Sequence, residues 1–346
     1  MTQFASPLRL KLDSDALVSN WRFLKGKGNA ECGAAVKANA YGLGAREVVP
    51  RLAAAGCRQF FVAHWAEAAA IADLVPPEQI AVLNGFDADD PADALQIGAV
   101  PVLNTPTQIA RWKAVGGGTC HVMLDSGINR LGIGAEQITA DLFDSLDIDI
   151  LLSHLASADQ DVPQNVVQLA LFRQMSAAIT AKRKSLANSA GIMLGADYHF
   201  DLTRPGLALY GGIARPEMAG SIRPVVKLQA SVLQVRTLPA GSPVGYNATF
   251  TTNAPTRIVT ISIGYADGYW RGFSNKGDVV FEGLRLPVIG RVSMDLLIVD
   301  ASAAPHIHEG QWVDVSFDLA SASDLSHMSQ YELLTGIGGR SDRFWT

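Results

Sequence analysis

Short apolar runs, each followed by a longer stretch rich in alanine or leucine, recur along roughly the first two thirds of the chain. This alternation is typical of a parallel sheet with helical crossovers. The predicted strand ends are Val36, Val62, Leu83, Leu103, Leu124, Leu152, Ala187 and Leu207. They are about 20 to 34 residues apart, which leaves room for one crossover helix each, and eight such units close a barrel.

The pattern changes from about Pro224 onward, where runs of Val, Ile and Thr are broken by Gly and Pro. Such runs favour strands. The strand candidates are residues 225–237, 256–263, 279–281, 296–299 and 312–316. We therefore predict an α/β protein of two domains, an N-terminal (β/α)8 TIM-type barrel over residues 1–223 and a β-rich C-terminal domain over residues 224–346.

The composition of the chain argues against a nucleic-acid-binding protein, a membrane protein and a cysteine metal site. The chain has 28 Lys and Arg against 33 Asp and Glu, a net charge of -5 and no basic run, so nucleic acid is not an expected partner. No apolar stretch approaches the roughly 20 residues of a spanning helix, and the amino terminus lacks a signal-peptide layout, which predicts a cytoplasmic protein without a membrane segment. Cys32, Cys57 and Cys120 lack metal-type spacing, so we expect reduced core cysteines and no metal.

Polar side chains follow most of the predicted strand ends, at the face where barrel enzymes place their chemistry. These residues are Lys37, Asn84, Asn104, Asp125, His154, Asn188 and Ser189. Lys37 is the most informative, because it ends the apolar run 32–36 and precedes the turn residues Gly42 and Gly44. Burial lowers a lysine pKa and makes the amine nucleophilic enough to form a Schiff base or to act as a base. A lysine that snorkels to solvent at a strand end is the alternative.

Motifs in both halves of the chain resemble the alanine racemase family. They occur in the family's order, and it is their combination that is specific. The matching segments are residues 36–44, 124–132, 154–159, 188–189, 204–211, 245–246, 264–269 and 290–295. The resemblance implies the barrel with its β-rich domain and the cofactor pyridoxal 5'-phosphate, which needs a lysine, phosphate donors and a partner for the pyridine nitrogen.

The resemblance assigns the cofactor site residue by residue. Lys37 forms the internal aldimine, and Arg204 faces the pyridine nitrogen, which stays unprotonated because a guanidinium keeps its proton near neutral pH. The other residues that it places around the cofactor are Tyr41, His154, Asn188, Ser189, Gly206 and Leu207. Tyr41, Ser189, Gly206 and Leu207 bind the phosphate. Ser189 alone also fits a helix N-cap, and Arg204 alone also fits a salt bridge at a helix start.

Racemisation needs a second acid–base group opposite Lys37, and the resemblance assigns this role to Tyr246 from the neighbouring subunit of a homodimer. It places His154 next to Tyr246 and Arg204 behind His154, a positive chain that would lower the phenol pKa. Viewed alone, Tyr246 also fits a strand tyrosine with a satisfied hydroxyl.

The resemblance also assigns the substrate site. Arg130 lies near the cofactor phenolic oxygen and the substrate carboxylate, which a fixed cation stabilises. Met294 and Asp295 come from the partner subunit and meet that carboxylate. The substrate entrance is lined by Asp159, Tyr265, Arg271 and Arg291. These four residues also fit a solvated ion-pair cluster.

The chain departs from the family at three positions. Met123 replaces a lysine that carries a carboxylate in many members, so we expect an anion such as chloride, or an amide, to position Arg130. Ser185 replaces a histidine of some members and should shorten the hydrogen-bond chain behind Arg204. Gly339 replaces a gate tyrosine before Arg340, which should leave a more tolerant pocket.

The function implied by the resemblance is an alanine racemase that uses a two-base mechanism through a cofactor–substrate aldimine and supplies D-alanine for peptidoglycan. A serine or broad-spectrum amino-acid racemase is the first alternative, because it would differ mainly in pocket width. A related decarboxylase pairs the pyridine nitrogen with a carboxylate, whereas this chain offers Arg204. A non-catalytic pyridoxal-phosphate carrier would usually stop after the barrel.

Overall fold

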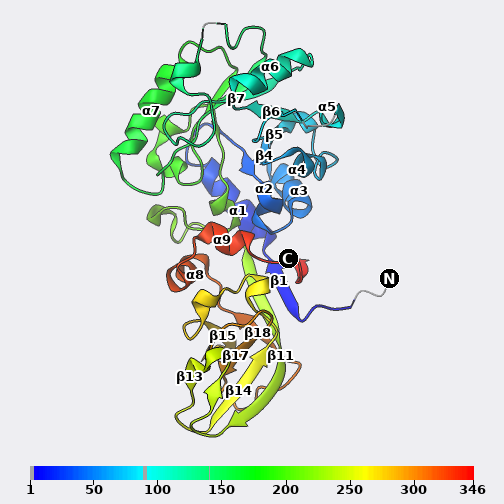
Figure 1. Ribbon diagram of the computed structural model, residues 1–346, viewed down its shortest axis with the longest axis vertical. Helices are drawn as coiled ribbons and strands as arrows, with labels where there is room; N and C mark the ends of the chain where they lie inside the picture. Colours follow the sequence, from blue (N-terminus) through cyan, green and yellow to red (C-terminus); the bar gives the residue numbers. More distant parts are fainter. Residues whose placement is uncertain (1–3, 89–91, 140) are drawn as a thin grey trace. The chain divides into compact units, whose positions relative to one another are not determined.

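The computed structural model describes residues 4–88, 92–139 and 141–346 (Figure 1). The chain divides into two compact units. One is Leu17–Arg223, which we call the barrel unit. The other combines Pro224–Thr346 with the amino-terminal segment that ends at Ala16, and we call it the β unit.

The barrel unit contains a sheet of seven parallel strands that follow one another in chain order. These are β3 (Ala34–Ala35), β4 (Phe60–Val62), β5 (Ile80–Val82), β6 (Val100–Leu103), β7 (Cys120–Met123), β8 (Ile148–Leu152) and β9 (Arg183–Ser185). Most of their residues are buried, as expected for parallel strands covered on both faces. The predicted strands are therefore present, with ends within about two residues of those expected from the pattern.

The two ends of this sheet are connected through an eighth strand. β10 (Leu202–Thr203) pairs in parallel with β2 (Glu31–Cys32), which immediately precedes β3. On the side of β9, the Arg204 N–H donates to the carbonyl of Ala187 at 2.8 Å. The backbone hydrogen bonds thus run around the whole set of eight units, as a closed barrel requires.

The eighth strand ends earlier than predicted. The sequence pattern places its end near Leu207, whereas β10 ends at Thr203 and Leu207 begins the 3-10 helix η5 (Leu207–Tyr210). Pro205 has no N–H with which to continue a ladder. The next N–H, that of Gly206, donates to the side chain of Ser189 at 2.9 Å instead. An apolar run alone does not reveal this change of hydrogen-bond partner.

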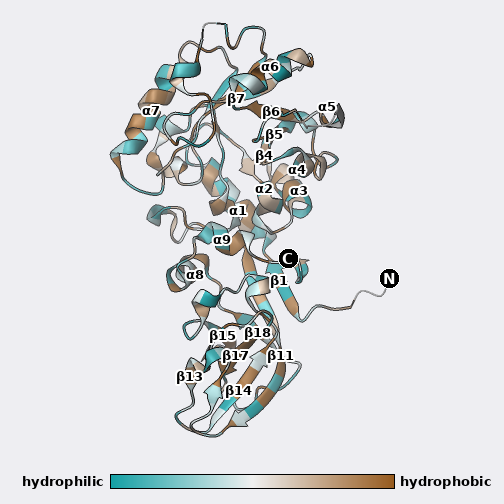
Figure 2. Ribbon diagram, in the orientation of Figure 1, coloured by the Kyte–Doolittle hydropathy of each residue, from teal (hydrophilic) through white to brown (hydrophobic). Residues whose placement is uncertain are grey.

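The connections from β7 to β8 and from β9 to β10 contain 3-10 helices. α-Helices occur in most other connections of the barrel unit. They are α1 (Ser14–Lys25), α2 (Lys37–Tyr41), α3 (Ala45–Ala55), α4 (Trp65–Ala69), α5 (Ala92–Ile97), α6 (Pro106–Ala114) and α7 (Pro163–Ser176). In α7, Leu169 and Phe172 are buried while Val166 and Val167 are exposed, so the buried face is set by the sheet that it covers rather than by hydropathy alone. Figure 2 shows apolar and polar turns alternating along this helix.

The β unit is organised around one long strand, β11 (Val226–Leu238), with antiparallel neighbours on both sides. Its main sheet also contains β1 (Leu8–Leu12), β14 (Thr256–Ile261), β15 (Asp278–Phe281), β16 (Leu284–Pro287), β17 (Leu297–Asp300), β18 (Trp312–Val315) and β19 (Asp342–Trp345). A hairpin of β12 (Pro243–Val244) and β13 (Phe250–Thr251) and the helices α8 (Leu319–Ser326) and α9 (Gln330–Thr335) complete the unit. The expectation of a β-rich C-terminal region is confirmed.

The amino-terminal segment differs from the expected domain limits, which assigned residues 1–223 to the barrel. β1 pairs antiparallel with β11 and parallel with β19, so its backbone hydrogen bonds belong to the β unit. A strand partner more than 200 residues away is not visible in a local pattern. For this reason the segment that ends at Ala16 groups with Pro224–Thr346.

Among the described residues, no helix is both long and apolar enough to cross a membrane, and no group of His, Cys, Asp and Glu is arranged to hold a metal ion. Cys32, Cys57 and Cys120 are free thiols in the core, as predicted, and burial raises the pKa of Cys57 to about 12. Buried thiols with raised pKa values are poor nucleophiles. The chemistry of this chain therefore lies elsewhere.

Candidate active site

The backbone immediately after β3 adopts a rare conformation. In α2, Ala38, Asn39, Ala40 and Tyr41 all have φ between 52° and 55°, in the left-handed region. This costs about 1 to 2 kcal/mol per non-glycine residue. Several such residues in succession persist only where surrounding contacts impose them, and Lys37 is the first residue of this turn. Strain of this kind marks a candidate functional site.

Lys37 is half-buried at this position, and its pKa is lowered. Desolvation is the main cause, the positive charges of Arg130 and Arg204 add to it, and the carboxylate of Glu67 acts in the opposite direction. The amine is thus easier to deprotonate than that of an exposed lysine, as the sequence pattern predicts. The alternative of a freely solvated side chain does not fit this desolvation.

Arg204 is buried, with only 7% of its surface exposed, and within the described part of the chain its guanidinium donates to a hydroxyl and a carbonyl rather than to a carboxylate. Its guanidinium donates to the hydroxyl of Ser185 at 2.5 Å and to the carbonyl of Ser153 at 2.6 Å. Burial lowers the Arg204 pKa to about 10, so the group remains a cation near neutral pH. The alternative of a helix-start salt bridge is not supported by these partners.

Ser185 lies behind Arg204, at the position where the sequence predicts a shorter hydrogen-bond chain. Its hydroxyl accepts from Arg204 and donates to the carbonyl of Leu202, so it joins β9 to β10 beneath the arginine. The chain behind Arg204 is therefore short, as expected for a serine in place of a histidine. The hydroxyl nevertheless fixes the direction of the guanidinium.

His154 follows the end of β8 and faces three cations. Desolvation, followed by the positive charges of Arg204, Arg130 and Lys37, lowers the His154 pKa to about 3. The expected positive chain from Arg204 through His154 is thereby corrected, because a neutral imidazole carries no charge near pH 7. Positive charge at this place comes from Arg204.

Ser189, Gly206 and Tyr41 form a compact cradle. The Ser189 hydroxyl accepts from the N–H groups of Gly206 at 2.9 Å and Ala208 at 3.2 Å. A Cβ at residue 206 would collide with the Tyr41 hydroxyl, so a residue larger than glycine would displace this phenol. The Tyr41 ring stacks on Tyr210 with the ring centroids 4.8 Å apart, which fixes the direction of its phenol.

Ser189 does not act as the N-cap of the helix that follows, whose N-cap is Ala190. The Asn188 side-chain oxygen accepts from the N–H of Gly191 at 2.8 Å, at the start of the 3-10 helix η3 (Gly191–Leu194). Ser189 instead reaches across to the loop after β10. The two residues of the predicted Asn–Ser pair therefore differ in role. Asn188 stabilises the turn that leads to Gly191, and Ser189 belongs to the cradle.

Arg130 lies in a loop that one carboxylate organises. The Asp125 side chain accepts four backbone N–H groups, from residues 127 to 130, including Arg130 itself at 3.1 Å. The Met123 side chain is buried beneath this loop, where its Cγ would be 3.1 Å from a Cβ at Gly132. With Met123 in place of the lysine of other members, the backbone of Arg130 is still positioned by the carboxylate of Asp125.

Asp159 lies on an exposed loop after β8 that is held from below by a buried arginine. Arg215 donates to the carbonyl of Ala158 at 3.0 Å and to the carboxylate of Asp161 at 2.5 Å, and it also contacts Glu217. These carboxylates raise the Arg215 pKa. The sequence did not predict these contacts of Arg215, because its ion-pair partners Asp161 and Glu217 do not lie within a motif.

In the β unit, Tyr246 begins the 3-10 helix η7 (Tyr246–Ala248), and 64% of its surface is exposed. Gly245 precedes it with φ 69°, a conformation that favours glycine. The phenol is thus presented outward by a tight turn. The alternative of a packed strand tyrosine does not hold.

The segment that carries Met294 and Asp295 is fixed by a second turn of the β unit. The N–H groups of Tyr265 and Ala266 donate to the carbonyls of Ser293 and Met294, at 3.1 and 3.0 Å. The Met294 side chain itself is 53% exposed. Backbone contacts therefore hold this segment while its side chains remain at the surface.

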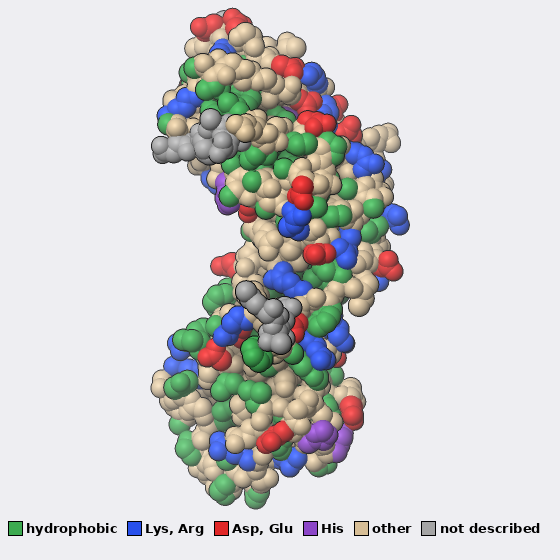
Figure 3. Space-filling view, turned by 90° about the vertical axis from the view of Figure 1, so that its right-hand side faces the viewer, with side chains coloured by type: hydrophobic (Ala, Val, Ile, Leu, Met, Phe, Trp, Pro, Cys, Tyr) green, Lys and Arg blue, Asp and Glu red, His purple; other side chains and the backbone are tan. Residues whose placement is uncertain are grey.

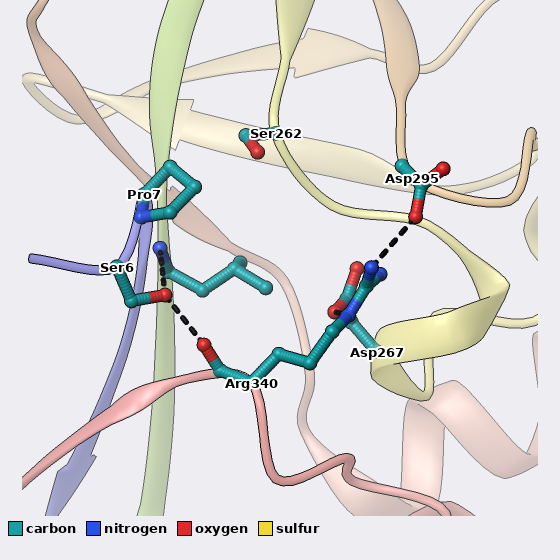
Figure 4. Close-up of a pocket in the computed structure, with 7 residues that line it drawn as sticks. Ser6, Pro7, Ser262, Asp267, Asp295 and Arg340 are labelled. Atoms are coloured by element: carbon teal, nitrogen blue, oxygen red, sulfur yellow. Dashed lines mark hydrogen bonds and ion pairs between the residues drawn. The ribbon is translucent and has the colours of Figure 1, made fainter. Parts of the chain in front are cut away.

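Arg340 connects Asp295 to the interior of the β unit, as Figure 4 shows. Its guanidinium donates to the carboxylates of Asp267 and Asp295, both at 2.8 Å. Asp267 is buried and also accepts from the N–H of Gly264 at 3.0 Å. These residues line a cavity of about 170 Å³ together with Ser6. A Cβ added at Gly339 would meet no heavy atom within 4 Å apart from its own backbone and chain neighbours, so the space around this residue is open.

The remaining predicted entrance residues also lie in the β unit. The Arg271 guanidinium lies over the Tyr265 ring, 5.2 Å from its centroid, so this pair is a cation–π contact rather than an ion pair. The backbone of Arg291 passes beside Gly245, which precedes Tyr246. On the face that Figure 3 presents, acidic and basic side chains are interspersed, without a continuous basic field of the kind that nucleic acid requires.

Comparison with known proteins identifies the family. The family model of the alanine racemase N-terminal domain matches residues 12–214 of the sequence. The family model of the alanine racemase C-terminal domain matches residues 225–345. The chain is 41% identical to an alanine racemase of Rhodospirillum rubrum, a match that covers 96% of this chain and 94% of the relative. It is 42% identical to a catabolic alanine racemase of Agrobacterium fabrum, with 96% and 91% covered.

A solved structure extends this likeness to three dimensions. The crystal structure of alanine racemase from Bartonella henselae with covalently bound pyridoxal phosphate is 38% identical, has a TM-score of 0.92, and covers 99% of this chain and 100% of its own. Both domain models together span nearly the whole sequence. The chain therefore belongs to the alanine racemase family, whose members are pyridoxal-phosphate-dependent isomerases.

Proposed function

We propose that this protein is a cytoplasmic alanine racemase that interconverts L- and D-alanine with pyridoxal 5'-phosphate and supplies D-alanine for peptidoglycan. The observation that carries the proposal is the cluster at one face of the barrel. There Lys37, with a lowered pKa, is surrounded by the charges of Arg130 and Arg204, and the Ser189–Gly206 cradle lies after late strands. Family membership and this cluster support the same conclusion.

The residues present fit the cofactor. The cradle offers the Tyr41 and Ser189 hydroxyls and the backbone at Gly206 and Leu207 for a phosphate, at the usual phosphate position of such barrels. Lys37 would hold the cofactor covalently through its Nζ. Arg204 would face the pyridine nitrogen, with His154 nearby. The bound cofactor would supply an electron sink for charge that develops on the substrate α-carbon.

Two groups of this chain would then move the proton. Lys37 would remove or deliver it on one face of the α-carbon, and the Tyr246 phenol would do so on the other. Arg130 would stabilise the substrate carboxylate together with the backbone of Met294 and the side chain of Asp295. Arg204, as a cation that keeps its proton, would leave the pyridine nitrogen unprotonated and so limit side reactions such as transamination.

The homodimer is part of the proposal. Tyr246 and Met294 are large apolar side chains that are more than half exposed in the single chain, and they are the residues assigned to the substrate of the neighbouring subunit. Burial of such side chains by a second copy would also place the phenol in a drier environment. We further propose that chloride or an amide completes the surroundings of Arg130, that Asp159, Tyr265, Arg271 and Arg291 line the entrance, and that no metal takes part.

The first test is incubation of the purified protein with pyridoxal phosphate and either L-alanine or L-serine, followed by chiral chromatography. We expect D-alanine to form faster. Comparable rates for D-serine would support the alternative of a broad-spectrum racemase, which the open space at Gly339 favours. If neither D-alanine nor D-serine forms, the proposal is overturned and the carrier alternative is supported.

The role of residue 339 can be tested separately. Replacing Gly339→Tyr restores a phenol at the place where other members have a gate, and the open backbone surroundings can accept it. We expect the ratio of alanine to serine turnover to rise by about tenfold, since one hydroxyl or methylene changes discrimination in a pocket by about 1 to 3 kcal/mol and tenfold lies at the lower end of that range. An unchanged ratio would exclude Gly339 as a determinant of selectivity.

A further inference from the structure

Glu67 ties the turn after Lys37 to the neighbouring strand of the barrel. It lies in the first turn of α4, and its side chain is only 18% exposed. One carboxylate oxygen accepts the N–H of Ala38 at 2.7 Å, and the other accepts the N–H of Ala63 at 2.7 Å. Ala38 directly follows Lys37, and Ala63 directly follows β4. One carboxylate therefore bridges the carboxyl ends of two adjacent strands.

The first of these contacts is made to a strained segment. Ala38 is the first of the residues with left-handed φ, and within the turn the Gly42 N–H donates back to the Ala38 carbonyl at 2.8 Å. Farther along, the Asn39 side chain accepts from the Ala45 N–H at 2.8 Å. Glu67 thus holds the residue directly after Lys37 from outside the turn, while the Val36 N–H before Lys37 donates to the carbonyl of Phe61 at 2.8 Å. Such external contacts are what an over-determined strained segment requires.

Glu67 also acts on the charge of Lys37. Arg130 and Arg204 lower the Lys37 pKa, His154 is neutral, and Glu67 raises it. The exposed His64 lies 3.9 Å from the Glu67 carboxylate. The N–H groups of Ala38 and Ala63 hold the two oxygens of this carboxylate in place. The same group therefore holds the backbone of Lys37 and partly offsets its cationic surroundings.

We propose that Glu67 is a positioning residue for Lys37, which holds the left-handed turn in place and favours protonation of the nitrogen that joins Lys37 to the cofactor. The inference rests on the proposed function for the second of these roles only. The first role, holding the turn, depends only on hydrogen bonds to the backbone of this chain. One measurement can therefore test the effect on the turn and another the effect on protonation.

Three variants distinguish geometry from charge. Glu67→Gln removes the charge and leaves one oxygen to accept, Glu67→Asp keeps the charge but is one methylene too short to bridge both N–H groups, and Glu47→Gln is the matched control. Glu47 is an exposed carboxylate of the neighbouring helix α3 and pairs with Arg51. Its loss removes a nearby charge without touching the turn.

Amide hydrogen exchange of the holoenzyme measures the geometric role. We expect exchange at Ala38 to be about tenfold faster in Glu67→Gln and Glu67→Asp than in wild type, because each loses an acceptor for a local N–H. Exchange should be unchanged in Glu47→Gln. Equal exchange at Ala38 in all four proteins would overturn the positioning role.

A pH titration of the absorbance of the lysine-bound cofactor measures the role of the charge. The negative charge of Glu67 favours the protonated link, so its removal should lower the titration midpoint by about one unit in Glu67→Gln, a tenfold change in proton affinity. Glu67→Asp and Glu47→Gln should titrate like wild type. A Glu67→Gln midpoint equal to that of the control would overturn this role. Absence of any lysine-bound cofactor in wild type would instead overturn the proposed function, and exchange at Ala38 would still decide on Glu67.

Discussion

The groups assigned to chemistry in the barrel unit and in the β unit lie in different environments. Arg204 is buried and Lys37 half-buried, and their surroundings are completed by residues of the same unit, such as Ser185 and Glu67. Tyr246 is 64% exposed, on a turn that presents it outward. A phenol exposed to water is a weak base at neutral pH. Arg204 and Lys37 are therefore preorganised by their own chain. Tyr246 would need to be covered by another surface, such as a second copy of the chain, before it could act as a base.

The largest effect should come from removing either proposed base. We expect Lys37→Ala and Tyr246→Phe to lower alanine racemisation by about 10³-fold or more, because each removes proton transfer on one face of the α-carbon. Only Lys37→Ala should also abolish the absorbance of lysine-bound cofactor. Racemisation assays and absorbance spectra of both variants measure this, with Lys27→Ala as an exposed-lysine control. A fully active Tyr246→Phe enzyme would contradict the two-base mechanism.

Mixing these two inactive variants tests whether one copy completes the site of another. In a mixed dimer with shared sites, one site contains the wild-type Lys37 of one copy and the wild-type Tyr246 of the other. Refolding equal amounts together should restore about a quarter of wild-type activity, because about half of the dimers are mixed and each has one intact site. If each chain completed its own site, the mixture would stay inactive.

Acid should destabilise the barrel unit through His121 and His154, whose pKa values are lowered. Desolvation lowers the His121 pKa to about 3, and the His154 pKa is lowered to a similar value. Both pKa values are depressed below the unfolded value of about 6.5, so this stabilisation is full above pH 6.5 and is lost as pH falls toward 3. At pH 4.5 we expect about 2 to 3 kcal/mol less stability per histidine than at pH 7.

Urea unfolding at pH 7 and at pH 4.5 measures this loss. His121→Asn should reduce the pH dependence, since an asparagine oxygen can accept the Ile150 N–H that the His121 Nδ1 accepts at 3.2 Å without taking up a proton. His306→Asn, at an exposed position of the β unit, should leave the dependence unchanged. The same slope in all three proteins would show that the imidazoles of His121 and His154 are not its source.

The smallest effect concerns the strained turn. Ala38 is exposed and has φ 52°, so Ala38→Gly should relieve steric strain and stabilise the protein by about 0.5 to 1 kcal/mol, after the added chain entropy is subtracted. The matched control is Ala66→Gly in α4, which should destabilise by about 1 kcal/mol because Ala66 is helical. Thermal unfolding of both variants compares them, and destabilisation by Ala38→Gly would show that its left-handed conformation is not strained.

Much of the fold could be predicted from the sequence. Most strands of the parallel sheet are apolar runs, because burial on both faces disfavours polar side chains, although β9 is the polar segment Arg183–Ser185. In the β unit, β11, β14 and β18 show the Val- and Thr-rich pattern of a β domain. Lys37, Arg204 and Ser189 could be named because each lies in a motif at or near a strand end. These features are local, and a local pattern records them.

Other features depended on contacts between distant residues. The pairing of β1 with β11 and β19, the hydroxyl of Ser185 beneath Arg204, and the bridge from Glu67 to Ala38 join residues that no spacing rule connects. The same holds for the lowered pKa of His154, which results from desolvation and from the charges of three cations rather than from its sequence neighbours.

The sequence by itself determined the order of strands and helices, the family and the types of chemical group at the face of the barrel, because these follow from residue type and short-range pattern. Only the tertiary structure decided which groups are buried, which hydrogen bonds hold them and which charges face one another. Desolvation and electrostatic interaction depend on distance in space, and the chain brings Lys37, Glu67 and Arg204 together only when it folds.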